Sequence, residues 1–178
     1  MSQPLRITVA KRTPAAAAQL AELSRRLFYE AYAAQNTPEN MAAKADATFS
    51  PEQQLAELED PNVVYLEARM LQELVGYAKL RLHSELGLDP DKLPEDRLEV
   101  ERLYVAEDWI GTGLGATLMR RAIEEARQQQ CRAVVLGVWE HNTRAREFYQ
   151  RFGFRPIGQH LFQFGAEAQT DLILRKGL

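Results

Sequence analysis

The sequence predicts an α+β domain in which strands and helices pack in layers. Its 178 residues are enough for one sizeable core and too few for two comfortable domains. Segments with the two-residue alternation of strands and segments with the 3.6-residue periodicity of helices follow one another along the chain, without a repeat or a low-complexity linker. We therefore treat residues 1–178 as a single domain with the element order βα(α)βββαβαββ.

The first half of the chain opens with a short strand over Pro4–Ala10 and a long helix. Thr13 and Pro14 have the residue types of a helix cap and a first turn. Two shorter helices are expected in "NTPENMAAKADATF" and "SPEQQLAELEDP", because each begins with a cap residue followed by Pro and Glu. The buried stripe of the long helix is expected to contain Leu20, Leu23, Leu27 and Ala31.

A hairpin and a single strand come next. "NVVYLEARM" and "ELVGYAKLRLHS" are β-rich and separated by a turn near residues 71–73, and "ELGLDPDKLPEDR" is a polar loop. The strand Leu98–Ala106 alternates strictly. One face is expected to carry Leu98, Val100, Arg102 and Tyr104, and the other Glu99, Glu101, Leu103 and Val105.

The last third combines a glycine-rich loop, two helices and three strands. "RAVVLGVW" is a buried strand, and "RPIGQHLFQF" and "QTDLILRK" contain two more. Gly153 is expected to end the second helix. The buried stripe of the first helix comprises Leu114, Leu118, Met119, Ala122, Ile123 and Ala126, and that of the second Ala145, Phe148, Tyr149 and Phe152.

Composition excludes several classes of protein. With 22 Lys and Arg against 25 Asp and Glu, the net charge of −3 lacks the basic excess of a nucleic-acid-binding protein. The single cysteine, Cys131, cannot form an internal disulfide, and the first twenty residues lack the apolar core of a signal peptide. No apolar run of about 18 residues is present. We expect a cytoplasmic protein that binds neither nucleic acid nor membrane.

Three alternating glycines, Gly111, Gly113 and Gly115, open the first of these helices. A nucleoside-triphosphate loop requires Lys and Ser or Thr after the last glycine, but Ala116 and Thr117 follow here, and the G-x-G-x-G spacing differs from that of a dinucleotide-binding loop. Two readings remain. The glycines either allow a flexible turn, or bring backbone N–H groups at a helix start up to a pyrophosphate such as that of coenzyme A.

The motifs around this loop resemble those of the GNAT superfamily of acyl-CoA-dependent N-acetyltransferases. "ERLYV", "GTGLGATL" and "VWEHNTRAREFYQRFGF" correspond to that superfamily's strand, phosphate loop and following helix. "QNTPENM", "LEVERLYV", "LGVWEHN" and "QTDLILRK" resemble its PaiA-type spermidine/spermine N-acetyltransferases. The resemblance implies a mixed, mostly antiparallel sheet, splayed between the fourth and fifth strands, with helices on both faces.

The resemblance also implies a role for each motif residue. The backbone of Leu103, Tyr104 and Val105 would hold the thioester of acetyl-CoA, and Trp139 and Asn142 its pantetheine arm. A glutamate, Glu99 or Glu101, would be the base, and Tyr149 would contact the coenzyme and protonate its thiolate, with no metal involved. The pyrophosphate loop would comprise Gly111, Thr112, Gly113, Leu114, Gly115 and Ala116, although Ile110 and Thr112 stand where the superfamily usually has polar or basic residues.

Each of these assignments has a structural alternative. Glu99 and Glu101 are also compatible with a solvent-facing acidic pair, of which Glu101 would be partly buried by the core, and Tyr149 with a core aromatic. Arg120 and Arg121 suit solvent as well as phosphate. His141 and His160 are expected on the surface or within a strand, and Cys131 is expected to be a small buried hydrophobe.

The expected activity is direct acetyl transfer from acetyl-CoA to a primary amine, with a polyamine such as spermidine or spermine implied by the PaiA-type resemblance. An amino acid, a drug amine or a protein N-terminus is an alternative acceptor, and a non-catalytic CoA-binding regulatory module is an alternative class. A homodimer is one candidate oligomeric state. Acidic residues available to an acceptor site include Glu30, Glu39, Glu99, Glu101 and Glu140.

Overall fold

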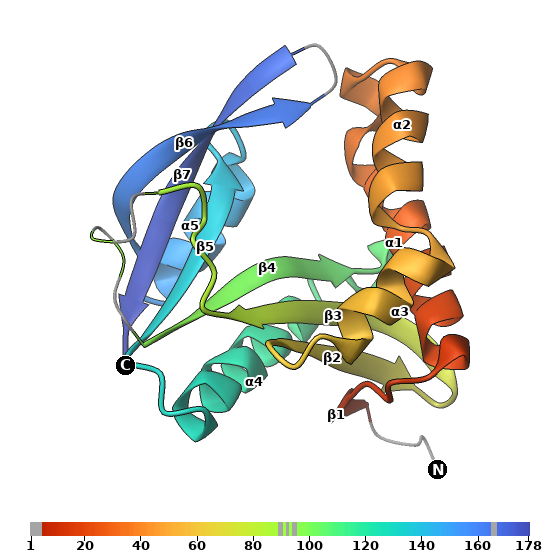
Figure 1. The fold of residues 1–178 in the computed structure, drawn as a ribbon, viewed down its shortest axis with the longest axis horizontal. Helices are drawn as coiled ribbons and strands as arrows, with labels where there is room; N and C mark the ends of the chain where they lie inside the picture. Colours follow the sequence, from red (N-terminus) through yellow and green to blue (C-terminus); the bar gives the residue numbers. More distant parts are fainter. Residues whose placement is uncertain (1–4, 89–90, 92, 94–95, 165–166) are drawn as a thin grey trace. The chain divides into compact units, whose positions relative to one another are not determined.

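The computed structural model describes residues 5–88, 91, 93, 96–164 and 167–178, and its contacts divide the chain into two compact units. Unit 1 comprises Met1–Leu80 and Arg102–Ala122, and unit 2 comprises Arg81–Glu101 and Ile123–Leu178. Figure 1 shows the elements of both units.

Seven strands form one sheet in the order β1-β2-β3-β4-β5-β7-β6. The β1–β2, β5–β7 and β6–β7 pairs are antiparallel, and β4–β5 is parallel. The parallel ladder spans three residue pairs, from Arg97–Ala133 to Glu99–Val135, although both strands continue beyond it. This confirms the predicted splay between the fourth and fifth strands. The strands are Arg6–Val9, Val63–Met70, Glu73–Leu82, Arg97–Val105, Ala133–Trp139, Arg155–Phe164 and Glu167–Gly177, numbered β1 to β7.

The three N-terminal helices of unit 1 begin where their cap residues predict. They are α1 (Pro14–Tyr32), α2 (Pro38–Thr48) and α3 (Pro51–Glu59), and each starts with proline. The hydroxyl groups of Thr13, Thr37 and Ser50 accept hydrogen bonds from the third residue after each cap, as capping requires. Short 3-10 turns lie at Ala33–Gln35 and Glu107–Trp109.

Helices pack on both faces of β3 within unit 1. The Tyr77 hydroxyl accepts a hydrogen bond from Ser24 of α1 at 2.7 Å. A Cβ atom on the preceding residue, Gly76, would lie 3.5 Å from Leu114 and from Leu118 of helix α4 (Leu114–Gln128). Because successive strand residues point to opposite faces, α1 and α4 lie on opposite sides of this strand. The prediction of helices on both faces is confirmed.

Unit 2 holds the strands β5, β7 and β6 and the helix α5 (Thr143–Arg151). The four residues Ala133–Leu136 of β5 are almost completely buried, as the run of apolar residues predicts. Gly153 has a φ of +88° and lies two residues after α5, so it ends the helix as expected.

Burial confirms some predicted stripes and corrects others. All six residues of the α4 stripe are buried, but Ala31 of α1 is exposed because the last turn of α1 projects beyond its packed segment. The residues predicted for the α5 stripe are only half-buried, and helix α5 contains no fully buried residue. Cys131 is half-buried rather than buried, in the turn before β5.

The predicted polar loop is described only in part. The polar loop after β3 contains residues 89, 90, 92, 94 and 95, which lie outside the described residues. In the parts of the chain that are described, no helix has both the length and the apolar character that crossing a membrane demands.

Candidate active site

The glycine loop adopts a backbone conformation that favours glycine. Gly111 and Gly113 have φ angles of +82° and +89°, and a Cβ atom on either would meet no heavy atom within 4 Å. Gly115 lies inside α4, where no unusual φ is required. Glycine is therefore favoured at positions 111 and 113 by the backbone conformation, and not by crowding from neighbouring atoms.

The start of α4 presents backbone donors next to this loop. Thr117 donates its N–H to the Gly113 carbonyl at 3.0 Å, which is the first turn of the helix. The N–H groups of Leu114, Gly115 and Ala116 precede that bond and have no intrahelical acceptor by helix geometry. The Thr112 hydroxyl is already engaged, because it donates a hydrogen bond to the Trp109 carbonyl at 2.6 Å. The loop can therefore offer an anion backbone donors and the positive end of a helix dipole.

The last residues of β4 lie against β3 in unit 1. The Ala106 N–H donates to the Val75 carbonyl at 2.9 Å, and the Tyr104 ring lies 5.7 Å from that of Tyr77. A Cβ atom on Gly76 would come within 2.9 Å of the Tyr104 carbonyl oxygen. A larger residue at 76 would thus displace the strand segment Leu103–Val105, which the family resemblance implies would hold the thioester.

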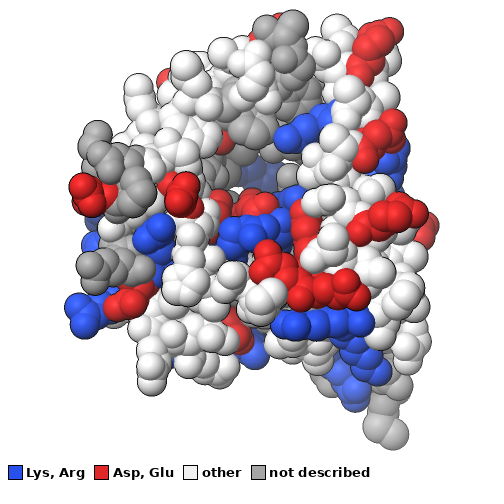
Figure 2. Space-filling model, viewed as in Figure 1, with Lys and Arg blue, Asp and Glu red and all other residues white. Residues whose placement is uncertain are grey.

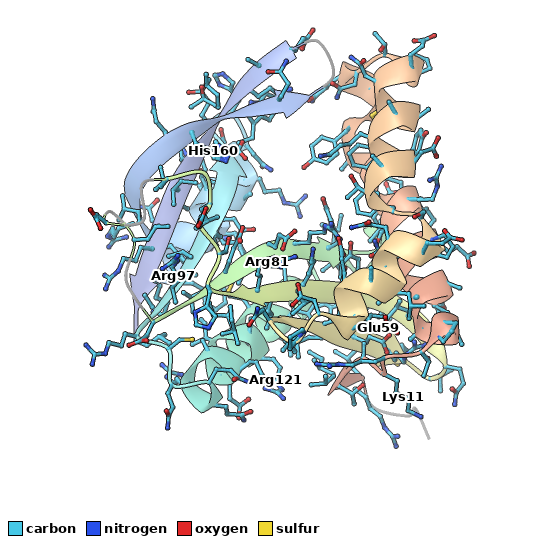
Figure 3. The ribbon with its side chains drawn as sticks, in the orientation of Figure 1. Lys11, Glu59, Arg81, Arg97, Arg121 and His160 are labelled. Atoms are coloured by element: carbon cyan, nitrogen blue, oxygen red, sulfur yellow. The ribbon has the colours of Figure 1, made fainter. Side chains whose placement is uncertain are left out.

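The two candidate bases have different surroundings in unit 2. Glu99 is 8% exposed, whereas the Glu101 side chain is 27% exposed and accepts a hydrogen bond from Arg81 Nε at 2.9 Å. Glu101 is partly buried, as expected, but Glu99 is more buried than Glu101. Glu99 pairs in register with Val135 inside the β4–β5 ladder, and Glu101 lies beyond its end, which explains the difference. Arg81 is labelled in Figure 3.

The region around α5 supplies the remaining predicted residues. Trp139 is the last residue of β5, and its carbonyl accepts the N–H of Asn142 at 2.9 Å. Asn142 caps α5 by accepting the Ala145 N–H at 3.1 Å. Tyr149 is half-buried, with its ring 5.3 Å from Phe148 and 5.9 Å from Phe154. Trp139 therefore lies at the end of β5 and Asn142 at the start of α5, and a backbone hydrogen bond joins the two residues.

A buried polar cluster in unit 1 was not predicted. The Glu57 carboxylate of α3 accepts from Lys79 Nζ and from Arg102, each at 3.1 Å, and also from the Tyr65 hydroxyl. The Arg102 guanidinium also lies 5.0 Å from the centre of the Phe49 ring. Burial alone raises the pKa of Glu57, but Arg102 and Lys79 outweigh it and lower that pKa below its usual value. The carboxylate is therefore held in its charged form.

The histidines and the cysteine considered in the sequence differ in their exposure and in their neighbours. His141 is exposed and lies 3.4 Å from Glu140, as expected of a surface histidine, and His160 lies on β6. Burial raises the pKa of the Cys131 thiol, as does nearby Asp96. Among the described residues, no three His, Cys, Asp or Glu side chains gather in a way that would hold a metal ion.

Comparison with known proteins decides the family. The family model described as "Acetyltransferase (GNAT) family" matches residues 18–154, which include parts of both units. This chain belongs to the GNAT family of acetyltransferases. The match covers the glycine loop, both glutamates and α5, and it confirms the enzyme class and the mixed, mostly antiparallel fold that the sequence predicts.

Relatives and solved structures agree with this assignment. An uncharacterized N-acetyltransferase of Lactobacillus delbrueckii subsp. lactis is 31% identical over 156 residues, covering 88% of each chain. The spermine/spermidine N(1)-acetyltransferase of Bacillus subtilis is 29% identical over 135 residues, covering 69% of this chain and 86% of its own. The crystal structure of the PaiA N-acetyltransferase of Thermoplasma acidophilum, in complex with coenzyme A, has a TM-score of 0.74 at 19% identity, covering 99% of this chain and 100% of its own.

Proposed function

We propose that this GNAT enzyme transfers the acetyl group of acetyl-CoA directly to a primary amine of a polyamine such as spermine or spermidine. The choice of acetyl-CoA as the acetyl donor rests on the loop at Gly111–Gly113 and on the start of helix α4 that follows it. The acceptor half is supported by the name of the Bacillus subtilis relative. The bound coenzyme A of the Thermoplasma structure supports the donor.

The glycine loop would bind the pyrophosphate of the coenzyme through backbone donors. A side chain is not needed for this, since the N–H groups of Leu114, Gly115 and Ala116 lie at the positive end of α4. Gly111 and Gly113 would allow the phosphate oxygens to approach the backbone closely, and Thr112 would contribute its backbone. The Leu103–Val105 backbone would hold the acetyl carbonyl, and Trp139 and Asn142 the pantetheine arm.

The acceptor amine must lose a proton before it attacks. An aliphatic ammonium has a pKa of about 10, so at neutral pH nearly all of it is charged. A carboxylate attracts this cation and, directly or through a water molecule, accepts its proton. We assign proton acceptance to Glu101, whose side chain is more exposed to water, and attraction of the cation to Glu99.

The leaving thiolate must gain a proton. The attacking nitrogen forms a C–N bond to the acetyl carbon while the C–S bond breaks, which leaves the coenzyme as a thiolate. A thiol has a pKa of about 8.5 and a phenol of about 10, so a tyrosine hydroxyl beside the sulfur can protonate it and regain its proton from solvent. Tyr149 is our candidate for this acid.

The test is an acceptor screen with two readouts. The purified protein is mixed with acetyl-CoA and, separately, with spermine, spermidine, butylamine, lysine or a peptide with a free N-terminus. Release of free thiol and the mass of the acetylated product are measured. We expect the highest kcat/KM with spermine or spermidine. A preference for lysine or the peptide would replace the polyamine by another acceptor, and coenzyme binding without thiol release from any amine would favour the regulatory-module alternative.

A further inference from the structure

Asp171 of β7 is a half-buried carboxylate with no hydrogen bond or ion pair to any residue that the structure describes. Burial raises the pKa of its carboxyl group, and nearby His160 opposes that shift. The charged form is therefore only weakly compensated within unit 2. A bound cation would supply the missing partner.

The strand register places Asp171 between two ring-bearing residues. Asp171 pairs with Trp139 of β5 on one side and with His160 of β6 on the other. Side chains of paired residues point to the same face, so the three form a row across the sheet of unit 2. Figure 3 labels His160 on β6. The Asp171 carboxylate lies beside exposed Gly137, since a Cβ atom there would be 3.6 Å from Asp171 Oδ2.

The loop after β3 approaches this row closely. Gly87 has a φ of +68°, and a Cβ atom on it would be 2.6 Å from His160 Cδ2, so only glycine fits over the ring. The His160 Nδ1 atom is buried and, among the described residues, has no hydrogen-bond partner. His160 is thus fixed by packing beside Asp171 and does not neutralise it through a direct contact.

The same face of unit 2 carries Glu99. Glu99 pairs with Val135 of β5, and Val135 lies four residues before Trp139, which is an even number, so both strand positions share one face with Asp171. Strand geometry separates Glu99 from Asp171 by roughly 13 Å along the strands and about 10 Å across them. These components combine to a separation of roughly 16 Å, which an extended spermine can span between its terminal nitrogens and which the shorter spermidine reaches less well.

We infer that Asp171 is a specificity-determining residue, which binds an ammonium group of a polyamine other than the one that is acetylated. The inference rests on the proposed polyamine acetyltransferase function. A monoamine has no second cation for Asp171 to bind. The residue should therefore affect the affinity for polyamines and leave the chemical step unchanged.

The experiment compares Asp171→Asn with the wild-type enzyme, using spermine, spermidine and butylamine at saturating acetyl-CoA. We expect KM for spermine to rise about threefold to tenfold, a modest change because solvent partly screens a half-exposed ion pair. The rise for spermidine should be smaller, because its chain is shorter. We expect no change in kcat for any amine and no change in KM for butylamine. Asp171→Glu keeps the charge and should recover most of the affinity. Glu167→Gln, an exposed position on the same strand, is the matched control.

Three results would overturn the inference. Equal KM values for spermine in wild type and Asp171→Asn would remove the subsite while leaving the polyamine activity intact. Equal losses for butylamine and spermine, accompanied by a lower melting temperature, would make Asp171 a structural residue. A wild-type enzyme that acetylates butylamine but neither polyamine would contradict the proposed acceptor, and that result is visible before any variant is made.

Discussion

Tyr149 is the residue whose proposed role is most easily separated from packing. Phenylalanine keeps the ring and its contacts with Phe148 and Phe154, and removes only the hydroxyl. For Tyr149→Phe we expect kcat to fall by roughly 10²-fold or more, with coenzyme affinity and melting temperature nearly unchanged. Steady-state kinetics, calorimetry and thermal unfolding measure the three quantities. Tyr29→Phe, at an exposed position of α1, is the control, and full turnover by Tyr149→Phe would leave Tyr149 a packing residue.

Glu99 and Glu101 should respond differently to removal of their charge. If Glu101 accepts the proton, Glu101→Gln should lower kcat/KM most at neutral pH and recover at high pH, where the amine loses its proton without help. If Glu99 attracts the cation, Glu99→Gln should mainly raise KM, and high salt should reduce the difference from wild type. The measurement is a pH and ionic-strength series with spermine and butylamine. Equal, pH-independent losses in both variants would refute this division of roles.

The cluster around Glu57 connects α3 to β3 and β4 within unit 1. Two buried cations, Lys79 and Arg102, share this carboxylate. Glu57→Gln would remove the negative charge that both cations contact, so we expect the free energy of unfolding to fall by about 3–5 kcal/mol. Urea unfolding measures it. Glu52→Gln, exposed on the same helix, should change it by less than about 0.5 kcal/mol. A loss from Glu57→Gln as small as that would mean that the cluster adds little to stability.

The same carboxylate predicts a pH dependence with a definite sign. Its pKa in the folded protein is below the model-peptide value of 4.5, so the unfolded chain binds this proton more tightly. The contribution of Glu57 is therefore complete above about pH 4.5 and is lost as the pH falls through the folded value. Urea titrations at decreasing pH should show a smaller further loss in Glu57→Gln than in wild type. Parallel losses in the two proteins would contradict this explanation.

Acidic and basic side chains are interspersed over the surface of α1–α3 (Figure 2), which agrees with the net charge of −3.

Binding of the coenzyme to the folded chain alone should raise the melting temperature, since a ligand at 100 times its Kd stabilises by about 2.7 kcal/mol. For a protein of this size that is a shift of roughly 5–10 °C. We expect this shift with coenzyme A in the presence of EDTA, because backbone donors require no metal.

Gly113→Val is the matched variant for that measurement. It places a branched side chain at a φ of +89°, where the backbone would approach the pyrophosphate. We expect coenzyme affinity to fall tenfold or more, which is about 1.4 kcal/mol, and the thermal shift to shrink accordingly. Gly177→Ala, near the C-terminus, should behave as wild type. An undiminished shift in Gly113→Val would remove the loop from the coenzyme site, and a shift abolished by EDTA would indicate a metal.

The elements that were predicted correctly are those specified by neighbouring residues. Thr13, Thr37 and Ser50 each cap a helix by accepting the N–H group three residues ahead, and the apolar stripe of α4 repeats within that helix. The positive φ angles of Gly111 and Gly113 are likewise a local property of glycine. These patterns, together with the motif resemblance, were sufficient for the fold and the family. The roles assigned to Tyr149 and to the glutamates remain predictions.

Contacts between distant residues depended on how the elements pack. Glu57 and Arg102 are 45 residues apart, and nothing near either residue indicates the other. The alternation of β4 placed Glu99 and Glu101 on one face, but only the ladder with β5, which ends between them, made the first buried and the second half-exposed. Asp171, His160 and Gly87 meet through strand register and a close loop. Burial and charge pairing arise from this packing, because they depend on which atoms replace water around a side chain, and local sequence periodicity does not contain that information.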